Sequence, residues 1–253
     1  MKALIVWAHP EEASFNGALA RLAEETLRQA GHEVRVRDLY REDFNAAASA
    51  DDFRTRRFPD HLQYDAEQAA AAEAGQFVEQ IKSHLEDLLW CDQLILQFPL
   101  WWFSVPAIMK GWIDRIMVKG VAYGGGRWYD RGGLTGRRAL LSITTAAYEQ
   151  MCAPDGVNGA MDVILWPLQQ GVLRFVGFDA LAPHIVWSAT YVDDAGRQAA
   201  MARYAQRLLS LDVEAAEPAH GRGDFGKDWR MLPEVEPLTV GHWRPGVSLP
   251  ASD

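Results

Sequence analysis

Short apolar runs alternate with amphipathic stretches along most of this chain. Residues 3–8 (ALIVWA), 94–98 (LILQF) and 138–144 (RALLSIT) are nearly continuous apolar runs, the pattern of parallel strands covered on both faces. Residues 33–40 alternate between apolar and polar, which indicates an outer strand, and residues 179–188 contain a further one.

Apolar residues at helical spacing separate these strands. Ser14 is placed to cap a helix that carries Phe15, Leu19 and Leu27 on one face, and Gly31 is placed to end it. Further helices are expected around residues 77–88, 106–117, 157–174 and 194–211, the second of these with Pro106 in its first turn. The alternation of strand and helix predicts an α/β fold, a doubly wound parallel sheet with helices on both faces.

Two regions interrupt this order. Residues 41–72 are polar, irregular and alanine-rich, and indicate a long excursion from the core. The last part of the chain is rich in Pro, Gly, Trp and charge without clear periodicity. We therefore expect one domain over residues 1–211 and a C-terminal extension, residues 212–253, that packs on the body or on a partner subunit.

Composition narrows the classes of partner. The formal net charge of -9, without a lysine or arginine cluster, argues against a nucleic-acid or anionic-membrane surface. No run approaches membrane-spanning length, and the N-terminus lacks the pattern of a signal peptide. Cys91 and Cys152 are the only cysteines, so a cytoplasmic, disulfide-free protein is the simplest interpretation.

Three loops follow strands at the predicted carboxyl edge of the sheet, where such folds bind ligands. His9, Ser14 and Asn16 lie in a strand-to-helix loop that suits an anion, Thr144 and Thr145 follow another strand, and PLWWFS (residues 99–104) follows the strand over residues 94–98. Taken singly, these features are as easily a capping histidine, β propensity and core aromatics. Together they match a flat, partly polar ligand such as an isoalloxazine ring.

Four segments carry a family resemblance: KALIVWAHPEEASFN, LQFPLWWFSVPAIMKGWIDRI, LLSITTAAYEQM and GAMDVILWPLQQGVLRFVGF. From residue 2 to about residue 210 the chain resembles the NAD(P)H:quinone oxidoreductases, also called DT-diaphorases. The resemblance implies a flavodoxin-like fold, a homodimer and a non-covalent FAD. It also implies ping-pong hydride transfer from NAD(P)H to a quinone through the flavin.

The resemblance also assigns roles to residues. FAD is expected on the first loop, the excursion, the aromatic loop, the third loop and the last helix: His9, Ser14, Phe15, Asn16, Gln63, Pro99, Leu100, Trp101, Trp102, Phe103, Thr144, Thr145, Ala146, Ala147, Cys152 and Arg197. The substrate pocket is expected to be walled by Trp102, Phe103, Tyr123, Gly125 and Phe175, with Phe175 from the second subunit. No metal is expected.

Several positions depart from the family pattern. Ala13 replaces a threonine, Ala146-Ala147 replaces Gly-Gly, and Gly125 replaces a tyrosine, which predicts a wider pocket mouth. A tyrosine and a histidine credited with relaying charge become Cys152 and Asn158, and Asn158 cannot titrate near neutral pH. The catalytic candidates are therefore Asn158, Tyr148 and Tyr123, with backbone N–H groups of residues 145–147 as donors to the reduced flavin.

Alternative functions share parts of this pattern. One is a general NAD(P)H-dependent flavin, azo or nitroaromatic reductase, and another is a regulatory flavoprotein subunit of a potassium-efflux system. A flavodoxin-type electron carrier is disfavoured by the chain length and the first loop. FMN is less favoured than FAD because Glu11 and Glu12 suit a diphosphate better than a terminal phosphate. The sequence leaves the NADH or NADPH preference and the physiological acceptor open.

Overall fold

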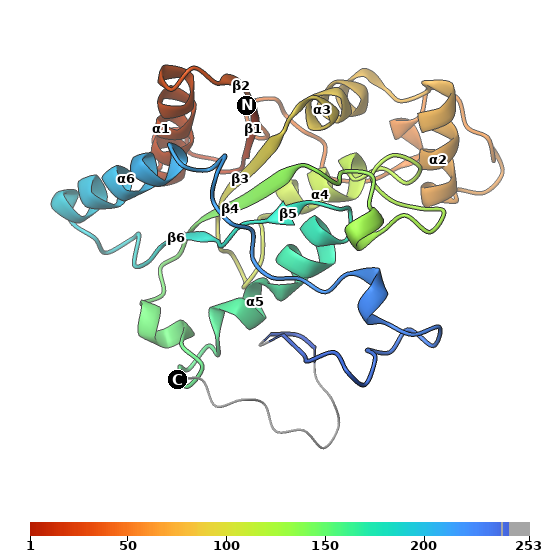
Figure 1. Cartoon of the computed structure of the whole chain (residues 1–253). Helices are drawn as coiled ribbons and strands as arrows, with labels where there is room; N and C mark the ends of the chain where they lie inside the picture. The colour runs from red at the N-terminus through yellow and green to blue at the C-terminus, as the bar shows by residue number, and fades with distance from the viewer. Residues whose placement is uncertain (239, 243–253) are drawn as a thin grey trace.

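A parallel sheet forms the centre of the molecule (Figure 1). The computed structural model describes residues 1–238 and 240–242. The strands are β1 (Lys2–Trp7), β2 (Glu33–Asp38), β3 (Gln93–Pro99), β4 (Arg138–Thr144), β5 (Asp179–Ala180) and β6 (His184–Val186). They lie in the order β2-β1-β3-β4-β5, with β6 also paired to β4. The predicted doubly wound parallel sheet is confirmed.

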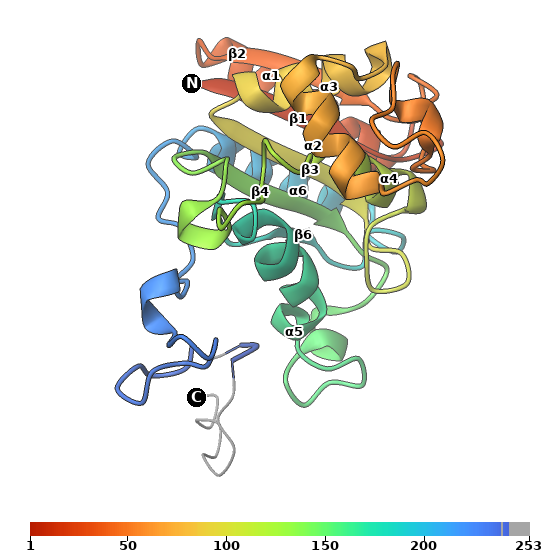
Figure 2. The ribbon, with the colours of Figure 1, turned by 90° about the vertical axis from the view of Figure 1, so that its right-hand side faces the viewer.

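Helices cover both faces of the sheet, as the second view shows (Figure 2). They are α1 (Phe15–Gln29), α2 (Tyr64–Ala74), α3 (Glu79–Trp90), α4 (Ala107–Ile116), α5 (Met161–Leu168) and α6 (Asp194–Leu208). The α1–α6 face is packed by Ile5, Leu27 and Ile95, and the opposite face by Leu4, Leu96 and Ile116 of the larger core. Residues of one strand alternate between the two cores because successive side chains point to opposite faces.

The ends of the helices follow the expected capping chemistry. The Ser14 hydroxyl accepts a hydrogen bond from the Gly17 amide at 3.1 Å, which satisfies one free donor of the first turn of α1. Gly31 follows the end of the same helix with φ +84°, a conformation that favours glycine. Pro106 lies immediately before α4.

Three boundaries differ from the sequence-based expectation. The excursion contains α2, which has high helix propensity from its alanines but little apolar periodicity to reveal it. The expected helix over residues 157–174 begins at Met161 and continues as a π-helix over Gln169–Arg174. Residues 179–188 hold two short strands, β5 and β6, rather than one.

A buried ion pair anchors the excursion to α4. Arg115 donates to both carboxylate oxygens of Asp52, at 3.0 and 2.6 Å, and the two side chains are 3% and 1% exposed. The Tyr64 hydroxyl, at the start of α2, donates to the same carboxylate at 2.5 Å, and burial together with that charge raises the Tyr64 pKa. The excursion is therefore folded onto the body by a bidentate charge pair.

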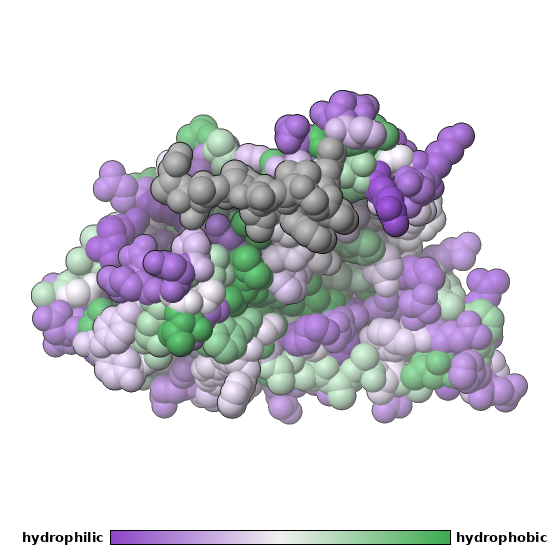
Figure 3. Space-filling model, turned by 90° about the horizontal axis from the view of Figure 1, so that it is seen from below, coloured by the Kyte–Doolittle hydropathy of each residue, from purple (hydrophilic) through white to green (hydrophobic). Residues whose placement is uncertain are grey.

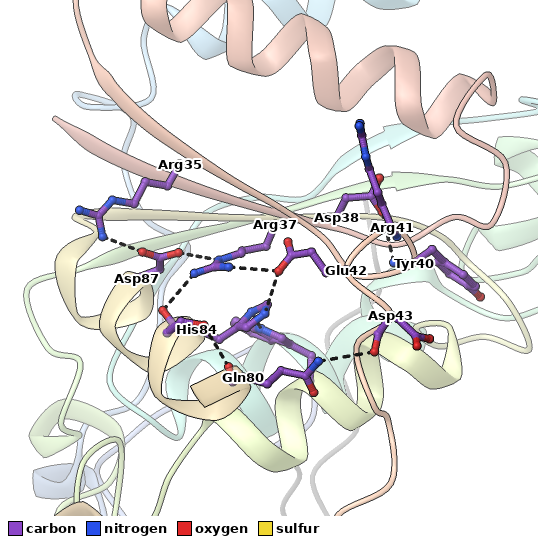
Figure 4. Close-up of polar contacts among 12 residues, drawn as sticks. Arg35, Arg37, Asp38, Tyr40, Arg41, Glu42, Asp43, Gln80, His84 and Asp87 are labelled. Atoms are coloured by element: carbon purple, nitrogen blue, oxygen red, sulfur yellow. Dashed lines mark hydrogen bonds and ion pairs between the residues drawn. The ribbon is translucent and has the colours of Figure 1, made fainter. Parts of the chain in front are cut away.

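A second polar network ties the edge strand β2 to α3 (Figure 4). Asp87 accepts from Arg35 and Arg37, both at 2.6 Å, and Arg37 also reaches Glu42 at 3.1 Å. His84 joins this chain through Nε2, 3.1 Å from Glu42. Burial raises the Glu42 pKa, but the contacts with His84 and Arg37 outweigh it and hold the pKa below its usual value.

The described part of the C-terminal extension lies against the body. The Glu217 amide donates to the Ala180 carbonyl at 2.9 Å, and Arg174 donates to the Glu217 carbonyl at the same distance. Farther along, the Arg222 amide donates to Asp130 at 3.0 Å. In the part of the chain that the structure describes, none of the helices has the length and apolarity needed to cross a membrane.

Candidate active site

The three loops singled out in the sequence start at one edge of the sheet. Trp7 at the end of β1 is the register partner of Gln97, and Pro99 at the end of β3 is the partner of Thr144 at the end of β4. The loops after β1, β3 and β4 therefore leave the sheet side by side, at the carboxyl edge where α/β folds bind ligands.

The loop after β3 is a tight aromatic hairpin. Trp101 and Ser104 exchange backbone hydrogen bonds, both at 3.0 Å, so Trp102 and Phe103 are the two central residues of the turn. Both have positive φ, +51° and +60°, the geometry of a type I′ turn. Such turns usually contain Asn-Gly, because a side chain in the left-handed region costs about 1–2 kcal/mol per residue.

The strained turn exposes two apolar rings to solvent. Trp102 is 96% exposed and Phe103 is 52% exposed, so neither ring recovers the cost through burial. Strain that the packing of the same chain does not repay is typical of ligand-binding positions. The hairpin presents a flat apolar surface at the carboxyl edge.

The first loop supplies an anion site at the start of α1. The backbone N–H groups of Phe15 and Asn16 make no hydrogen bond within the described residues and lie at the positive end of the helix. The Glu11 carboxylate accepts from the Ala13 amide at 2.8 Å, and His9 Nδ1 accepts from the Glu11 amide at 3.0 Å. These two bonds shape the loop without using the free helix amides.

The side chain of Asn16, which the sequence suggested as a donor to an anion, is buried and hydrogen-bonded within the protein. It is 4% exposed, and its side-chain amide is bonded on both sides. Gln97 on β3 donates to Asn16 Oδ1 at 2.9 Å, and Asn16 Nδ2 donates to Thr144 Oγ1 on β4 at 2.8 Å. Asn16 therefore connects the start of α1 to the ends of β3 and β4.

The third loop has fewer free amides than the sequence suggested. The Thr145 N–H donates to the Val186 carbonyl at 3.0 Å, and the Ala147 N–H donates to Thr145 Oγ1 at 3.1 Å. Among the three amides of residues 145–147, only that of Ala146 makes no bond within the described chain. Neither Ala146 nor Ala147 has positive φ, so replacing Gly-Gly causes no strain here.

The two positions that depart from the family relay are in contact. Asn158 Nδ2 lies 3.6 Å from the Cys152 sulfur, and the Asn158 amide donates to the Met151 carbonyl at 2.9 Å, which closes the loop. Cys152 is 6% exposed. Tyr148, in the same loop, is 53% exposed, and its ring is nearly parallel to that of Tyr191 at 6.1 Å.

The expected substrate-mouth residues form a separate group. The ring of Phe175 lies 5.6 Å from Tyr123 and 5.5 Å from Tyr129, and Gly125 is in the same 118–132 segment with φ +62°. In Figures 1 and 2 this yellow-green segment and the yellow hairpin after β3 lie on different sides of the molecule. Within the described residues, no ring contact joins Tyr123 or Phe175 to the hairpin.

The two remaining candidates lie on the surface. Gln63 is exposed immediately before α2, and Arg197 is in the first turn of α6, 3.5 Å from Asp194. Two residues near the edge were not singled out from the sequence. Gln97 resembles any polar residue in an apolar strand, and Tyr191 is in a loop whose position the sequence does not reveal.

The sheet order and the three loops at its carboxyl edge define a flavodoxin-like protein of the α/β class. The profile of the family described as having a flavodoxin-like fold matches residues 1–208.

Named relatives refine this class. The chain is 41% identical over 220 residues to mouse ribosyldihydronicotinamide dehydrogenase (quinone), covering 87% of this chain and 94% of that protein. It is 40% identical over 265 residues to rat NAD(P)H dehydrogenase (quinone) 1, covering 100% and 96%. A crystal structure of a candidate quinone reductase from Klebsiella pneumoniae has a TM-score of 0.91 at 38% identity, covering 96% and 98%. The chain belongs to the NAD(P)H:quinone oxidoreductase family, which confirms the resemblance found in the sequence.

The strain in the hairpin can be measured. We expect Trp102→Asn to raise the free energy of unfolding of the flavin-free protein by about 0.5–1 kcal/mol, because asparagine tolerates positive φ and the lost ring is exposed. Urea denaturation measures this change. The control is Tyr148→Asn, at an exposed aromatic residue with φ -74°, which should give no gain. Equal gains at both positions would show that the turn is not strained.

Proposed function

We propose that this chain is an NAD(P)H-dependent quinone reductase that carries a non-covalently bound flavin. The carrying observation is the strained, exposed Trp102-Phe103 turn beside the polar edge of Thr144 to Ala147. The oxidoreductase class follows from the family to which the chain belongs, and the printed names of the mouse and rat relatives support a quinone as acceptor.

The residues present fit a flavin. The free amides of Phe15 and Asn16 at the start of α1 would hold the phosphates, the hairpin would stack on the isoalloxazine, and the Ala146 N–H would face its polar edge. We propose FAD rather than FMN, since the family resemblance assigns Gln63 to a contact with FAD and Arg197 to its adenosine end, and Glu11 and Glu12 disfavour a terminal phosphate dianion.

The flavin, when bound, supplies the hydride-accepting and hydride-donating chemistry. The protein residues bind, orient and exclude water. The hairpin rings would form an apolar surface of the pocket. A nicotinamide and a quinone would bind in this pocket one after the other. The Ala146 amide would be a hydrogen-bond donor at the edge where negative charge develops.

The proposed activity has a direct test. Purified protein should be yellow, release FAD on denaturation, and oxidise NADH or NADPH in the presence of menadione with parallel steady-state lines, the mark of a ping-pong reaction. Chromatography of the released flavin and an absorbance assay measure these. A pure FMN peak would remove the FAD assignment. Flavin without any NAD(P)H–menadione turnover would favour the regulatory-subunit alternative over the reductase.

We also propose that the active site is completed by a second copy of the chain. The segment 118–132, which contains Tyr123, lies away from the hairpin of its own subunit. Because Phe175 contacts Tyr123, the two rings would wall that pocket only across an interface. Helix α5 exposes Val163 to 62%, and hydrophobic residues gather in a hollow on the side seen from below (Figure 3). Trp112 of α4 gives no support to an interface, because it is fully buried and donates to His84 Nδ1 of α3 at 3.0 Å.

Subunit mixing tests this arrangement. Ala146→Trp should fill the flavin edge and Tyr123→Arg should spoil the mouth, so each homodimer should be inactive. Co-expressed chains should regain about one quarter of wild-type activity, because half of the dimers are mixed and each of these has one intact site. Light scattering should show a dimer. No regained activity, or an active monomer, would contradict a shared site.

The Cys152–Asn158 pair generates a kinetic prediction. Because Asn158, an amide that does not titrate, takes the place of the family histidine, flavin reduction by NAD(P)H should be nearly independent of pH between about pH 6 and 8. Cys152→Tyr with Asn158→His should speed that step and introduce a pH dependence, since a general acid contributes about 10²–10⁴-fold. Stopped-flow absorbance measures both. A sharp bell-shaped profile in the wild type would point to another group, with Tyr148 the first to replace by Phe.

A further inference from the structure

Two tyrosine rings at the carboxyl edge of the sheet are exposed and stack on each other. Tyr148 belongs to the loop after β4 and is 53% exposed, while Tyr191 belongs to the loop between β6 and α6 and is 68% exposed. The two rings are nearly parallel, at 11°, and their centroids are 6.1 Å apart. Stacking stabilises the pair but leaves more than half of each residue open to solvent.

Backbone hydrogen bonds hold the two loops against each other. The Ser188 amide donates to the Ala147 carbonyl at 3.0 Å, and the Ala189 amide donates to the Thr145 carbonyl at 2.8 Å. The Tyr191 amide then donates to the Ser188 carbonyl at 2.7 Å, which closes a turn directly before the ring. The loops therefore present the two rings from backbone that is fixed at several points.

Ser188 has the same kind of backbone strain as the aromatic hairpin. Its φ is +52°, in the left-handed region that a residue with a side chain adopts only at a cost. Burial of the Tyr191 ring does not offset this cost, because the ring is exposed. Such strain clusters at ligand-binding positions. The turn at Trp102 and Phe103 and the turn at Ser188 thus have the same result, which is to hold aromatic rings in solvent at the carboxyl edge.

The tyrosine pair lies on the side of the site where α1 and α6 meet. Asn16, at the start of α1, donates to Thr144 Oγ1 at the end of β4. The next residue, Thr145, donates its amide to the Val186 carbonyl at the end of β6. Helices α1 and α6 pack side by side on this face of the sheet (Figure 1). The start of α1 therefore lies over the end of β4, and the loop of Tyr191 begins at the neighbouring strand.

A flavin dinucleotide has two flat ring systems, the isoalloxazine and the adenine, which are joined through a diphosphate. In the proposed function, the hairpin would bind the isoalloxazine and the free amides at the start of α1 would bind the phosphates. The adenine ring then has to lie within reach of α1. The Tyr148–Tyr191 pair is a flat surface at that place, and stacking on aromatic side chains is a common way for proteins to hold a base.

We infer that Tyr148 and Tyr191 form a stacking surface for an adenine ring, and that this ring is the adenine of bound FAD, an inference that rests on the proposed function. The surface would distinguish FAD from FMN, because FMN has no adenine. NADH and NADPH carry the same ring and are the second source that the experiment separates. Stacking uses the rings and not the hydroxyl groups, so phenylalanine should serve at either position.

The flavin affinity of the flavin-free protein tests this surface. Tyr148→Ala combined with Tyr191→Ala should weaken FAD binding about tenfold, because it removes base stacking, and should leave FMN binding unchanged. Tyr148→Phe combined with Tyr191→Phe should keep the wild-type affinity for both flavins. Leu209→Ala, at an exposed apolar residue at the far end of α6, is the control and should change neither affinity. Fluorescence titration measures binding, and the melting temperature of each flavin-free variant verifies that it is folded.

The outcomes separate the adenine surface from the proposed function. Equal losses of FAD and FMN affinity in the double alanine variant would overturn the adenine assignment. Unchanged FAD affinity together with an unchanged KM for NADH would overturn it too, while a wild-type protein that binds FAD and reduces menadione keeps the proposed function. Unchanged FAD affinity with a KM that rises for NADH, but not for reduced nicotinamide riboside, would support the adenine surface and overturn its assignment to FAD. A wild-type protein that binds no flavin would overturn the proposed function together with this inference.

Discussion

The buried side-chain amide of Asn16 is the interaction on which the site depends. It accepts from Gln97 on β3 and donates to Thr144 on β4, although it belongs to α1. One amide thus joins the three elements whose loops form the site. Since the amide has both a donor and an acceptor end, it fixes the order of the bonds as well as the spacing of the strands. Aspartate at this position could accept from Gln97 but could not donate to Thr144, and leucine could do neither.

A rigid edge of this kind makes the strained hairpin possible. Trp102 and Phe103 are held at positive φ by two backbone bonds between Trp101 and Ser104 and by the Leu100 amide, which donates to the Thr144 carbonyl at 2.8 Å. The hairpin therefore leaves β3 in register with β4. The hydrogen bonds to the core strands therefore stabilise a turn whose own aromatic residues are not buried. Both rings remain available to a ligand.

Repeating patterns in the sequence predicted the main strands and the ends of one helix. Continuous apolar runs located β1, β3 and β4, and the positions of Ser14 and Gly31 located the ends of α1. Helix α2 was hidden because alanine helices have little apolar periodicity. The site was predictable as a set of loops, but the bonds of Asn16 and the turn at Trp102 were not. The bonds of Asn16 can be predicted only if the neighbouring strands are known. The turn at Trp102 lacks the Asn-Gly sequence that usually marks such a turn. The assignments of individual residues to the flavin and the substrate stay predictions.

The separation of the hairpin from Tyr123 and Phe175 constrains how this fold can work. A single subunit presents an apolar platform with one open side, and water would reach any reactive ring placed on it. The aromatic group at Tyr123, Tyr129 and Phe175 is packed by its own ring contacts, so it is a preformed surface rather than a loose loop. Two preformed surfaces on different sides of one chain meet only when two chains associate. In the proposed dimer, closure of the pocket would be a property of the interface, and the polar edge at Thr144 would be the part of the site that each subunit builds alone.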